Sequence, residues 1–253
     1  MKTDNFDKII RGKNINFLIG SGASVPMYPS LSFGKGYPTF EEVASDINLS
    51  DDSKKFLYIY YYLRWIKKMG EPSDKFKSRI SKSNKYASVF YNYKRLIKIF
   101  YEFLQAESNE SPKRINVFTT NYDLLFERAF DDFLVYNPLI YFNDGSRGVF
   151  TKYINNKNFY LNVTHSGYND NYKREVPTVN LLKLHGSVSW KLHDDRIIVD
   201  EYNEVIRKIS NTVKKLGIKS KQVKDIIDTS KNENTHLFVE NLNNNVQNLK
   251  LND

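Results

Sequence analysis

Three short apolar segments, spread along the chain, each run into glycine or polar residues. They are NINFLIGSG (14–22), RINVFTTNYD (114–123) and TVNLLKLHGS (178–187). Short apolar runs bounded by turn residues are typical of strands in a parallel sheet that is covered on both faces. The pattern therefore predicts three buried, parallel strands whose carboxyl ends carry the polar residues.

Helical periodicity fills most of the chain between the first two strands. Apolar residues recur at helical spacing over about 40–108, and Pro38-Thr39 ahead of two glutamates is typical of a helix start. The segment LLFERAF (124–130) predicts the helix of a strand–turn–helix unit. Together these elements predict an α/β fold, a doubly wound parallel sheet with an inserted helical module at about 40–108.

The remaining segments are less regular. Residues 136–177 are rich in Asn, Asp, Gly and Tyr, and we expect a surface excursion with short strands such as NFYLNV (158–163). Helical periodicity returns after residue 200, and the end, NLNNNVQNLKLND (241–253), is polar. We expect one domain over 1–200, followed by a helical extension over 201–253 whose tail is frayed or marks where a longer protein was cut.

Composition limits the classes of function. The chain has 253 residues, of which 40% are hydrophobic, enough for a sizeable core. Neither a membrane-spanning apolar run nor a secretion signal is visible, so we expect a cytoplasmic protein that does not contact membranes. The absence of cysteine excludes disulfides and a zinc site built from four thiolates.

The net charge of +9 is concentrated in one region, because residues 54–114 carry 15 Lys and Arg against 5 Asp and Glu. This region also holds many tyrosines, and basic residues interleaved with aromatic ones can bind nucleic acid. However, the rings in FLYIYYYLRWIKKM and YKRLIKIFYEFL recur at helical spacing. We therefore favour rings packed in a core with lysines on the solvated face, and keep nucleic-acid binding as the alternative.

Ligands of doubly wound sheets bind at the carboxyl ends of the strands. After the first strand, Gly20 and Gly22 would let backbone N–H groups approach a pyrophosphate, and a following helix start would add the positive end of its dipole. A glycine pair is also typical of a tight turn with positive φ. Both interpretations stay open at this point.

The other two strand ends offer a set of groups suited to acid/base chemistry and ribose binding. They are Thr119, Thr120, Asn121 and Asp123 after the second strand, and His185, Gly186 and Ser187 after the third. An amide, a carboxylate and an imidazole from separate loops can act on one substrate. Alternatively, Asn121 and Asp123 cap the helix that begins at Leu124, and His185 is a turn residue.

The motifs GSGAS, with GYPTF downstream, then TTNYD and LHGS resemble, in this order, the sirtuin-like family. The resemblance is to the NAD-hydrolysing sirtuin-like domains of bacterial anti-phage defence systems, and it covers roughly residues 14–190. It implies a Rossmann-like sheet with an inserted helical module, and a NAD-binding catalytic domain over 1–200.

Carried over residue by residue, the resemblance implies a complete site. The phosphate loop would be Gly20, Ser21, Gly22, Ala23 and Ser24, and the Gly-x-Pro segment of the family would correspond to Pro38 and Thr39. Asn121 and Asp123 would face the nicotinamide ribose, and His185 would be the catalytic histidine. Thr120, Gly186 and Ser187 would complete the binding surface.

The resemblance implies an NAD⁺ hydrolase that releases nicotinamide and ADP-ribose and depletes NAD⁺ in abortive infection. NAD⁺ would be its substrate, and zinc would be absent because the cysteines of deacylase sirtuins have no counterpart. We also expect a homo-oligomer and a partner ATPase, helicase or sensor protein. The alternatives are a NAD-dependent protein deacylase, an ADP-ribosyltransferase, or a non-catalytic nucleotide-sensing or nucleic-acid-binding module.

Overall fold

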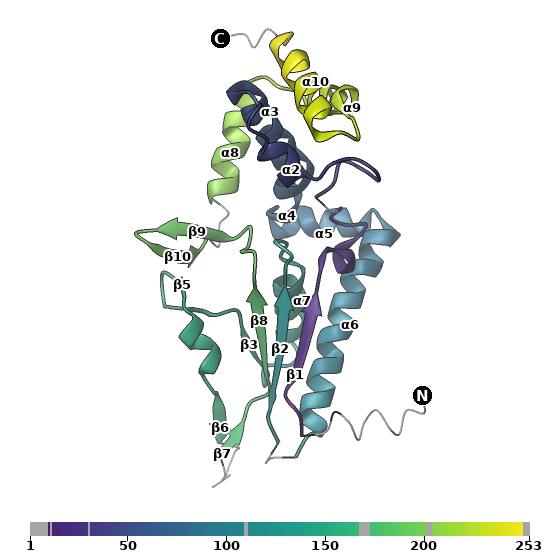
Figure 1. Ribbon diagram of the computed structural model, residues 1–253. Helices are drawn as coiled ribbons and strands as arrows, with labels where there is room; N and C mark the ends of the chain where they lie inside the picture. Colours follow the sequence, from purple (N-terminus) through teal and green to yellow (C-terminus); the bar gives the residue numbers. More distant parts are fainter. Residues whose placement is uncertain are drawn as a thin grey trace. The chain divides into compact units, whose positions relative to one another are not determined.

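The computed structural model describes residues 10, 12–29, 31–108, 111–166, 173–200 and 204–249. Its central element is a four-stranded parallel sheet (Figure 1). In spatial order the strands are β1 (Ile15–Ile19), β2 (Arg114–Thr119), β8 (Thr178–Lys183) and β3 (Tyr141–Asn143). The three predicted strands and the α/β fold are confirmed, and β3 is an additional strand from the segment expected to be a surface excursion.

The chain divides into two compact units. One comprises residues 1–27 and 72–202, and the other comprises 28–71 and 203–253. The first contains the parallel sheet, and the second is helical. The division at residue 200 stays a prediction, and the structure adds that the last residues group with 28–71.

Helices α6 (Asn84–Ala106) and α7 (Leu125–Leu134) of the first unit cover one face of the sheet. Helix α5 (Ser73–Ser81) packs on α6, where the rings of Phe76 and Phe90 lie 5.1 Å apart. Phe100 of α6 packs on Phe17 of β1 with ring centroids 4.8 Å apart, and Phe130 of α7 stacks on Phe142 of β3 at 4.4 Å. Ile115 and Val117 of β2 are fully buried. This face is therefore the core of the unit.

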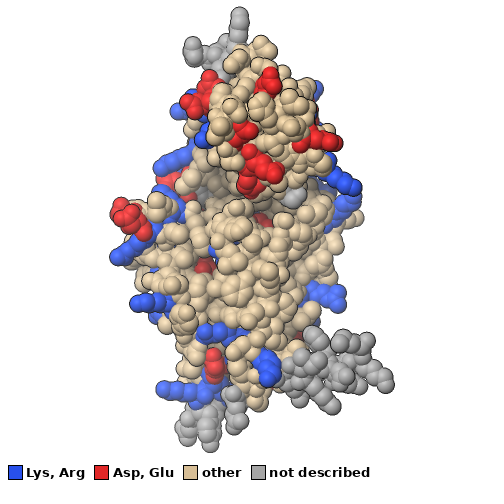
Figure 2. Space-filling model, viewed as in Figure 1, with Lys and Arg blue, Asp and Glu red and all other residues tan. Residues whose placement is uncertain are grey.

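The opposite face of the sheet carries a row of four hydrogen-bonded asparagines, one from each strand. Asn116 Nδ2 donates to Asn16 Oδ1 at 2.8 Å, Asn180 Nδ2 to Asn116 Oδ1 at 2.8 Å, and Asn143 Nδ2 to Asn180 Oδ1 at 3.0 Å. Leu18 on this face is 77% exposed, so the expectation of a first strand buried on both faces is wrong. Figure 2 shows a mostly uncharged surface over this part of the unit.

The first unit also contains two sheets of antiparallel strands. One sheet contains β4 (Ser146–Arg147), β5 (Tyr153–Ile154), β10 (Arg196–Val199) and β9 (Trp190–His193), and another pairs β6 (Thr164–Ser166) with β7 (Lys173–Glu175). The strand predicted at 158–163 is wrong, because Asn156–Tyr160 form a 3₁₀ helix, η3. The side chain of Asn155 accepts a hydrogen bond from Lys157 N and so favours the helical turn at that point.

The second unit confirms the helical periodicity found in the sequence. Its elements are α2 (Phe40–Ala44), α3 (Asp51–Tyr61), the π-helix η2 (Tyr62–Ile66), α4 (Lys67–Met69), α8 (Glu204–Lys215), α9 (Ser220–Ser230) and α10 (Thr235–Gln247). Tyr60, Tyr62 and Trp65 are at most 5% exposed. For these rings, the interpretation as core residues is confirmed.

The polar end of the chain is helical as far as residue 247, so the expected fraying is wrong for 241–247. Leu242 and Val246 are buried. The side chain of Asn243 donates to Asn48 O at 2.8 Å and accepts from Ser50 N at 3.1 Å, which fixes α10 to the segment before α3. The predicted frayed residues 250–253 lie outside the described residues. Among the helices that the structure describes, none has the length and apolar character of a membrane span.

Two leucines differ in exposure because the covered face of the sheet is buried, whereas the opposite face is exposed at β1. Leu181 is 2% exposed on the face beneath the helices, whereas Leu18 is 77% exposed on the other. We expect Leu181→Ala to lower the free energy of unfolding by about 2–5 kcal/mol, because it leaves a cavity. The matched change Leu18→Ala should stay within about 0.5 kcal/mol. Denaturant melts of both variants measure these free energies. Equal losses of stability would contradict the exposure of Leu18.

Candidate functional site

The carboxyl ends of β1, β2 and β8 lie together at one edge of the sheet. Backbone hydrogen bonds join the loops that follow them: Thr120 N donates to Ile19 O at 3.4 Å, Leu184 N to Thr119 O at 2.8 Å, and Val188 N to Tyr122 O at 3.0 Å. The parallel register therefore brings the three motifs GSGAS, TTNYD and LHGS side by side.

The loop after β1 is one turn of 3₁₀ helix, η1 (Ser21–Ser24). The expectation that a helix start adds its dipole is wrong here, because four residues form only a single turn. Neither Gly20 nor Gly22 has a positive φ, so the tight-turn explanation for the pair does not hold. A Cβ on Gly22 would meet no atom within 4 Å, so the fold itself leaves space at that position.

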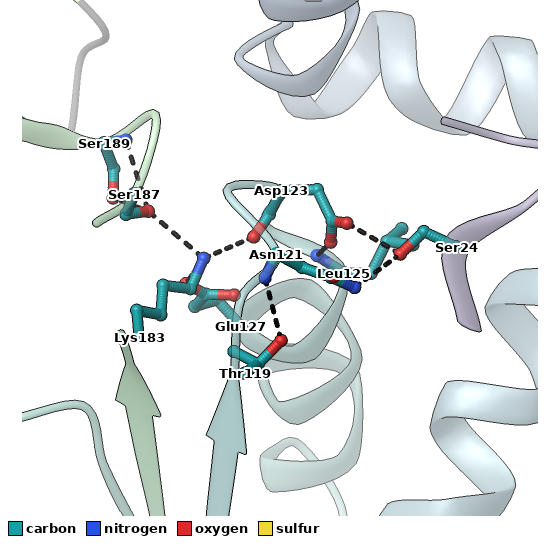
Figure 3. A network of polar contacts seen from close by, with 9 residues as sticks. All are labelled: Ser24, Thr119, Asn121, Asp123, Leu125, Glu127, Lys183, Ser187 and Ser189. Carbon is teal, nitrogen blue, oxygen red and sulfur yellow. Dashed lines mark hydrogen bonds and ion pairs between the residues drawn. The ribbon is translucent and has the colours of Figure 1, made fainter. Parts of the chain in front are cut away.

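A buried network joins this loop to the loop after β2 (Figure 3). The Ser24 hydroxyl donates to Asp123 Oδ2 at 2.7 Å, accepts from Asn121 Nδ2 at 3.1 Å and lies 2.8 Å from the hydroxyl of Tyr93. Because a serine has one O–H, already given to Asp123, Tyr93 must donate to Ser24. Burial, and next the nearby Asp123 carboxylate, raise the pKa of Tyr93, so this hydroxyl keeps its proton.

Asn121 is 7% exposed and is held on two sides. Its backbone N–H donates to Thr119 Oγ1 at 3.0 Å, and its side-chain NH₂ donates to Ser24. Its Oδ1 atom is buried and has no hydrogen-bond partner among the described residues. A buried acceptor without a partner is costly, and it is suited to receive a hydrogen bond from a ligand hydroxyl or a water molecule.

Both oxygens of Asp123 are used inside the protein. Oδ1 accepts from Leu125 N at 3.0 Å in the first turn of α7, and Oδ2 accepts from the Ser24 hydroxyl. The first contact agrees with the capping alternative for this residue. Contact of Asp123 with a ribose stays a prediction.

Sequence reasoning missed two charged residues, Lys183 and Glu127. Lys183 Nζ lies 2.7 Å from Glu127 Oε1 and donates to Asp123 O and, at 3.2 Å, to Ser187 Oγ (Figure 3). Burial raises the pKa of the Glu127 carboxyl, while the ammonium of Lys183 opposes that rise. A lysine inside the apolar run TVNLLKL was the signal that could have identified the pair.

The loop after β8 leaves His185 exposed. Its ring lies 6.3 Å from the ring of Tyr122, the residue that follows Asn121. Gly186 has φ +88°, a conformation that favours glycine, and so turns the chain directly after the histidine. The structure thus brings His185 and Asn121 to adjacent loops, one side chain accessible and the other buried.

Pro38 and Thr39 belong to the second unit, whereas the other predicted site residues belong to the first. Thr39 caps α2: its Oγ1 accepts from Glu42 N at 3.2 Å, and its N–H donates to Glu42 Oε2 at 2.5 Å. The backbone hydrogen bond from Thr39, and next that from its side chain, lower the pKa of Glu42. A role of Pro38 and Thr39 in binding NAD stays a prediction.

Three cavities of about 480–560 Å³ lie elsewhere: over the asparagine row, along α9, and beside α5 and the start of α6. None of them is lined by Asn121 or His185. Within the described residues, no group of three or more His, Asp or Glu could hold a metal ion.

A family model described as a SIR2-like domain matches residues 115–239. The match begins in β2 and includes the TTNYD and LHGS motifs. No curated protein matches the chain. Residues 115–239 are thus similar to a SIR2-like domain, and the parallel sheet with an antiparallel insert is consistent with a Rossmann-like fold of that kind.

The network predicts that Ser24 matters for stability. Ser24→Ala should lower the free energy of unfolding by about 1–3 kcal/mol, because Asp123, Asn121 and Tyr93 each lose a buried partner. Ser45 is the control, since its exposed hydroxyl donates only to Glu42 O at 3.3 Å, and Ser45→Ala should stay within about 0.5 kcal/mol. Thermal and denaturant melts measure both, and a loss no larger than the control's would refute the network.

Proposed function

We propose that this protein hydrolyses NAD⁺ at the bond between nicotinamide and ribose, giving nicotinamide and ADP-ribose. The observation that carries the proposal is the buried Oδ1 of Asn121, which has no hydrogen-bond partner among the described residues. Ser24 holds this amide through its nitrogen, beside the loop that carries His185. The similarity of residues 115–239 to a SIR2-like domain supports NAD⁺ as the substrate.

The reaction needs the groups that these two residues supply. As the bond from ribose C1′ to nicotinamide breaks, its electron pair leaves with nicotinamide and positive charge develops on the ribose. Water adds to C1′ and loses a proton. Asn121 Oδ1 would accept a hydrogen bond from the attacking water or a ribose hydroxyl, and His185 would accept the proton or orient a hydroxyl.

The loop Gly20–Ser24 is proposed to hold the diphosphate of NAD⁺. Its glycines are not required by backbone conformation, and the position of a Cβ on Gly22 is open. A glycine that the fold does not require fits a place where a ligand approaches the backbone closely. The same loop ends at Ser24, which holds Asn121, so phosphate and ribose would bind to connected groups.

Because of the resemblance to anti-phage NAD hydrolases, we also propose a role for the activity in an infected cell. Depletion of NAD⁺ would stop growth of an infected cell, and the activity would be restrained by assembly into a homo-oligomer or by a partner ATPase, helicase or sensor. The absence of cysteine supports hydrolysis over deacylation, because the thiolate zinc site of deacylase sirtuins cannot form.

Asn121→Ala and His185→Ala should each slow nicotinamide release from NAD⁺ by about 10²–10⁴-fold, the range for a positioned acid/base group. The double variant should be little slower than the less active of the two single variants, because the effects of groups that act as a unit are non-additive. His193→Ala is the control, since this exposed histidine lies in the β9–β10 hairpin. Chromatography of the products beside melting curves measures rate and stability together.

An Asn121→Ala protein that is destabilised but fully active would contradict the catalytic role of Asn121. Formation of an acylated ADP-ribose or of a modified protein, in place of free ADP-ribose, would favour the deacylase or transferase alternatives.

Gly22→Val tests the phosphate loop separately. Because Gly22 lacks a positive φ and has free space around it, the variant should fold, and its melting temperature should match that of the parent. Its affinity for NAD⁺ should fall sharply, because the branched side chain occupies the space proposed for phosphate. An affinity within about threefold of the parent, roughly 0.7 kcal/mol, would show that the loop does not hold phosphate.

A further inference from the structure

Lys183 is a charged residue in an unusually enclosed place. Its side chain is 4% exposed, and it projects from the last residue of β8, directly before the LHGS loop. Burying an ammonium group is unfavourable unless partners replace its water. Lys183 has three such partners, which equals the number of N–H donors on its ammonium.

The three partners of Lys183 come from three different parts of the site. Glu127 Oε1, 2.7 Å away, belongs to α7. The backbone carbonyl of Asp123 belongs to the loop after β2, and Ser187 Oγ, 3.2 Å away, belongs to the loop after β8. The ammonium therefore joins the two loops that carry Asn121 and His185.

The ion pair itself is a weak explanation for the presence of Lys183. Replacing a buried ion pair by apolar side chains of similar volume is often neutral or stabilising. Glu127 also keeps a buried Oε2 without a partner among the described residues, so the pair is not optimised for stability. An apolar side chain could not, however, donate hydrogen bonds to the carbonyl of Asp123 and the hydroxyl of Ser187, which belong to two different loops.

We propose that Lys183 is a positioning residue that fixes the Asn121 loop and the His185 loop at one separation, with Glu127 holding the ammonium in place. Asn121 stands two residues before the carbonyl of Asp123, and His185 stands two residues before Ser187. Backbone hydrogen bonds also join these loops, so releasing a Lys183 contact should widen the range of separations between the amide and the imidazole without unfolding the site. The proposal rests on the proposed function only in its effect on rate.

The test uses Lys183→Met, which keeps most of the side-chain volume and removes the donors. We expect the protein to fold, kcat for nicotinamide release to fall by about 10- to 100-fold, and KM for NAD⁺ to change much less. Lys94→Met is the matched control, since Lys94 forms an exposed ion pair with Asp132 at 3.5 Å that joins α6 to α7. A folded Lys183→Met protein with kcat within twofold of the parent overturns the proposal.

Amide hydrogen exchange supplies a readout that does not need activity. In Lys183→Met, exchange should accelerate in both 120–125 and 184–189, while Lys94→Met leaves both segments unchanged. Acceleration in neither segment, or in only one, overturns the proposal. Should Lys183→Met fail to fold, Glu127→Gln replaces it with the same two criteria, because it removes the negative charge that holds the ammonium and preserves the shape of the side chain. Absence of nicotinamide release by the parent protein contradicts the proposed function, and exchange still decides the role of Lys183.

Discussion

The parallel register of β1, β2 and β8 is the constraint on which the site depends. Residues far apart in sequence pair directly: Ile19 pairs with Thr119, 100 residues later, and Thr119 pairs with Lys183, a further 64 residues along. The chain continues from all three strands at the same edge, so the loops must meet there. The alternating burial of β2 favours this register, because a shift by one residue would move Ile115 and Val117 from the buried face to the opposite one.

Polar contacts hold together the carboxyl edge of the sheet. Ser24 uses its donor and both acceptor positions, and Lys183 uses all its donors. In contrast to these groups, the buried Oδ1 of Asn121 has no hydrogen-bond partner among the described residues. A network that fixes an amide and leaves its acceptor unused is what recognition of a hydroxyl requires.

Apolar runs and the turn residues that follow them were sufficient to predict three strands, the helix α7 that follows the TTNYD motif, and the helical content of both units. They missed β3, because three residues between polar segments carry too little pattern. They also predicted a strand at 158–163, where the side chain of Asn155 caps the 3₁₀ helix η3 instead. Lys183 and Ser24 could not be given their roles, since each depends on partners distant in sequence, and the need for Gly22 could not be judged without its φ.

The central claim is that three strand ends form one site for NAD⁺. The most direct measurement is titration of ¹⁵N-labelled protein with NAD⁺, followed by NMR. We expect the backbone amides of Gly22 and His185 and the side-chain amide of Asn121 to shift together with one dissociation constant. Shifts confined to the asparagine row of the sheet, at Asn16 and Asn116, or no shifts at saturating NAD⁺, would contradict the account.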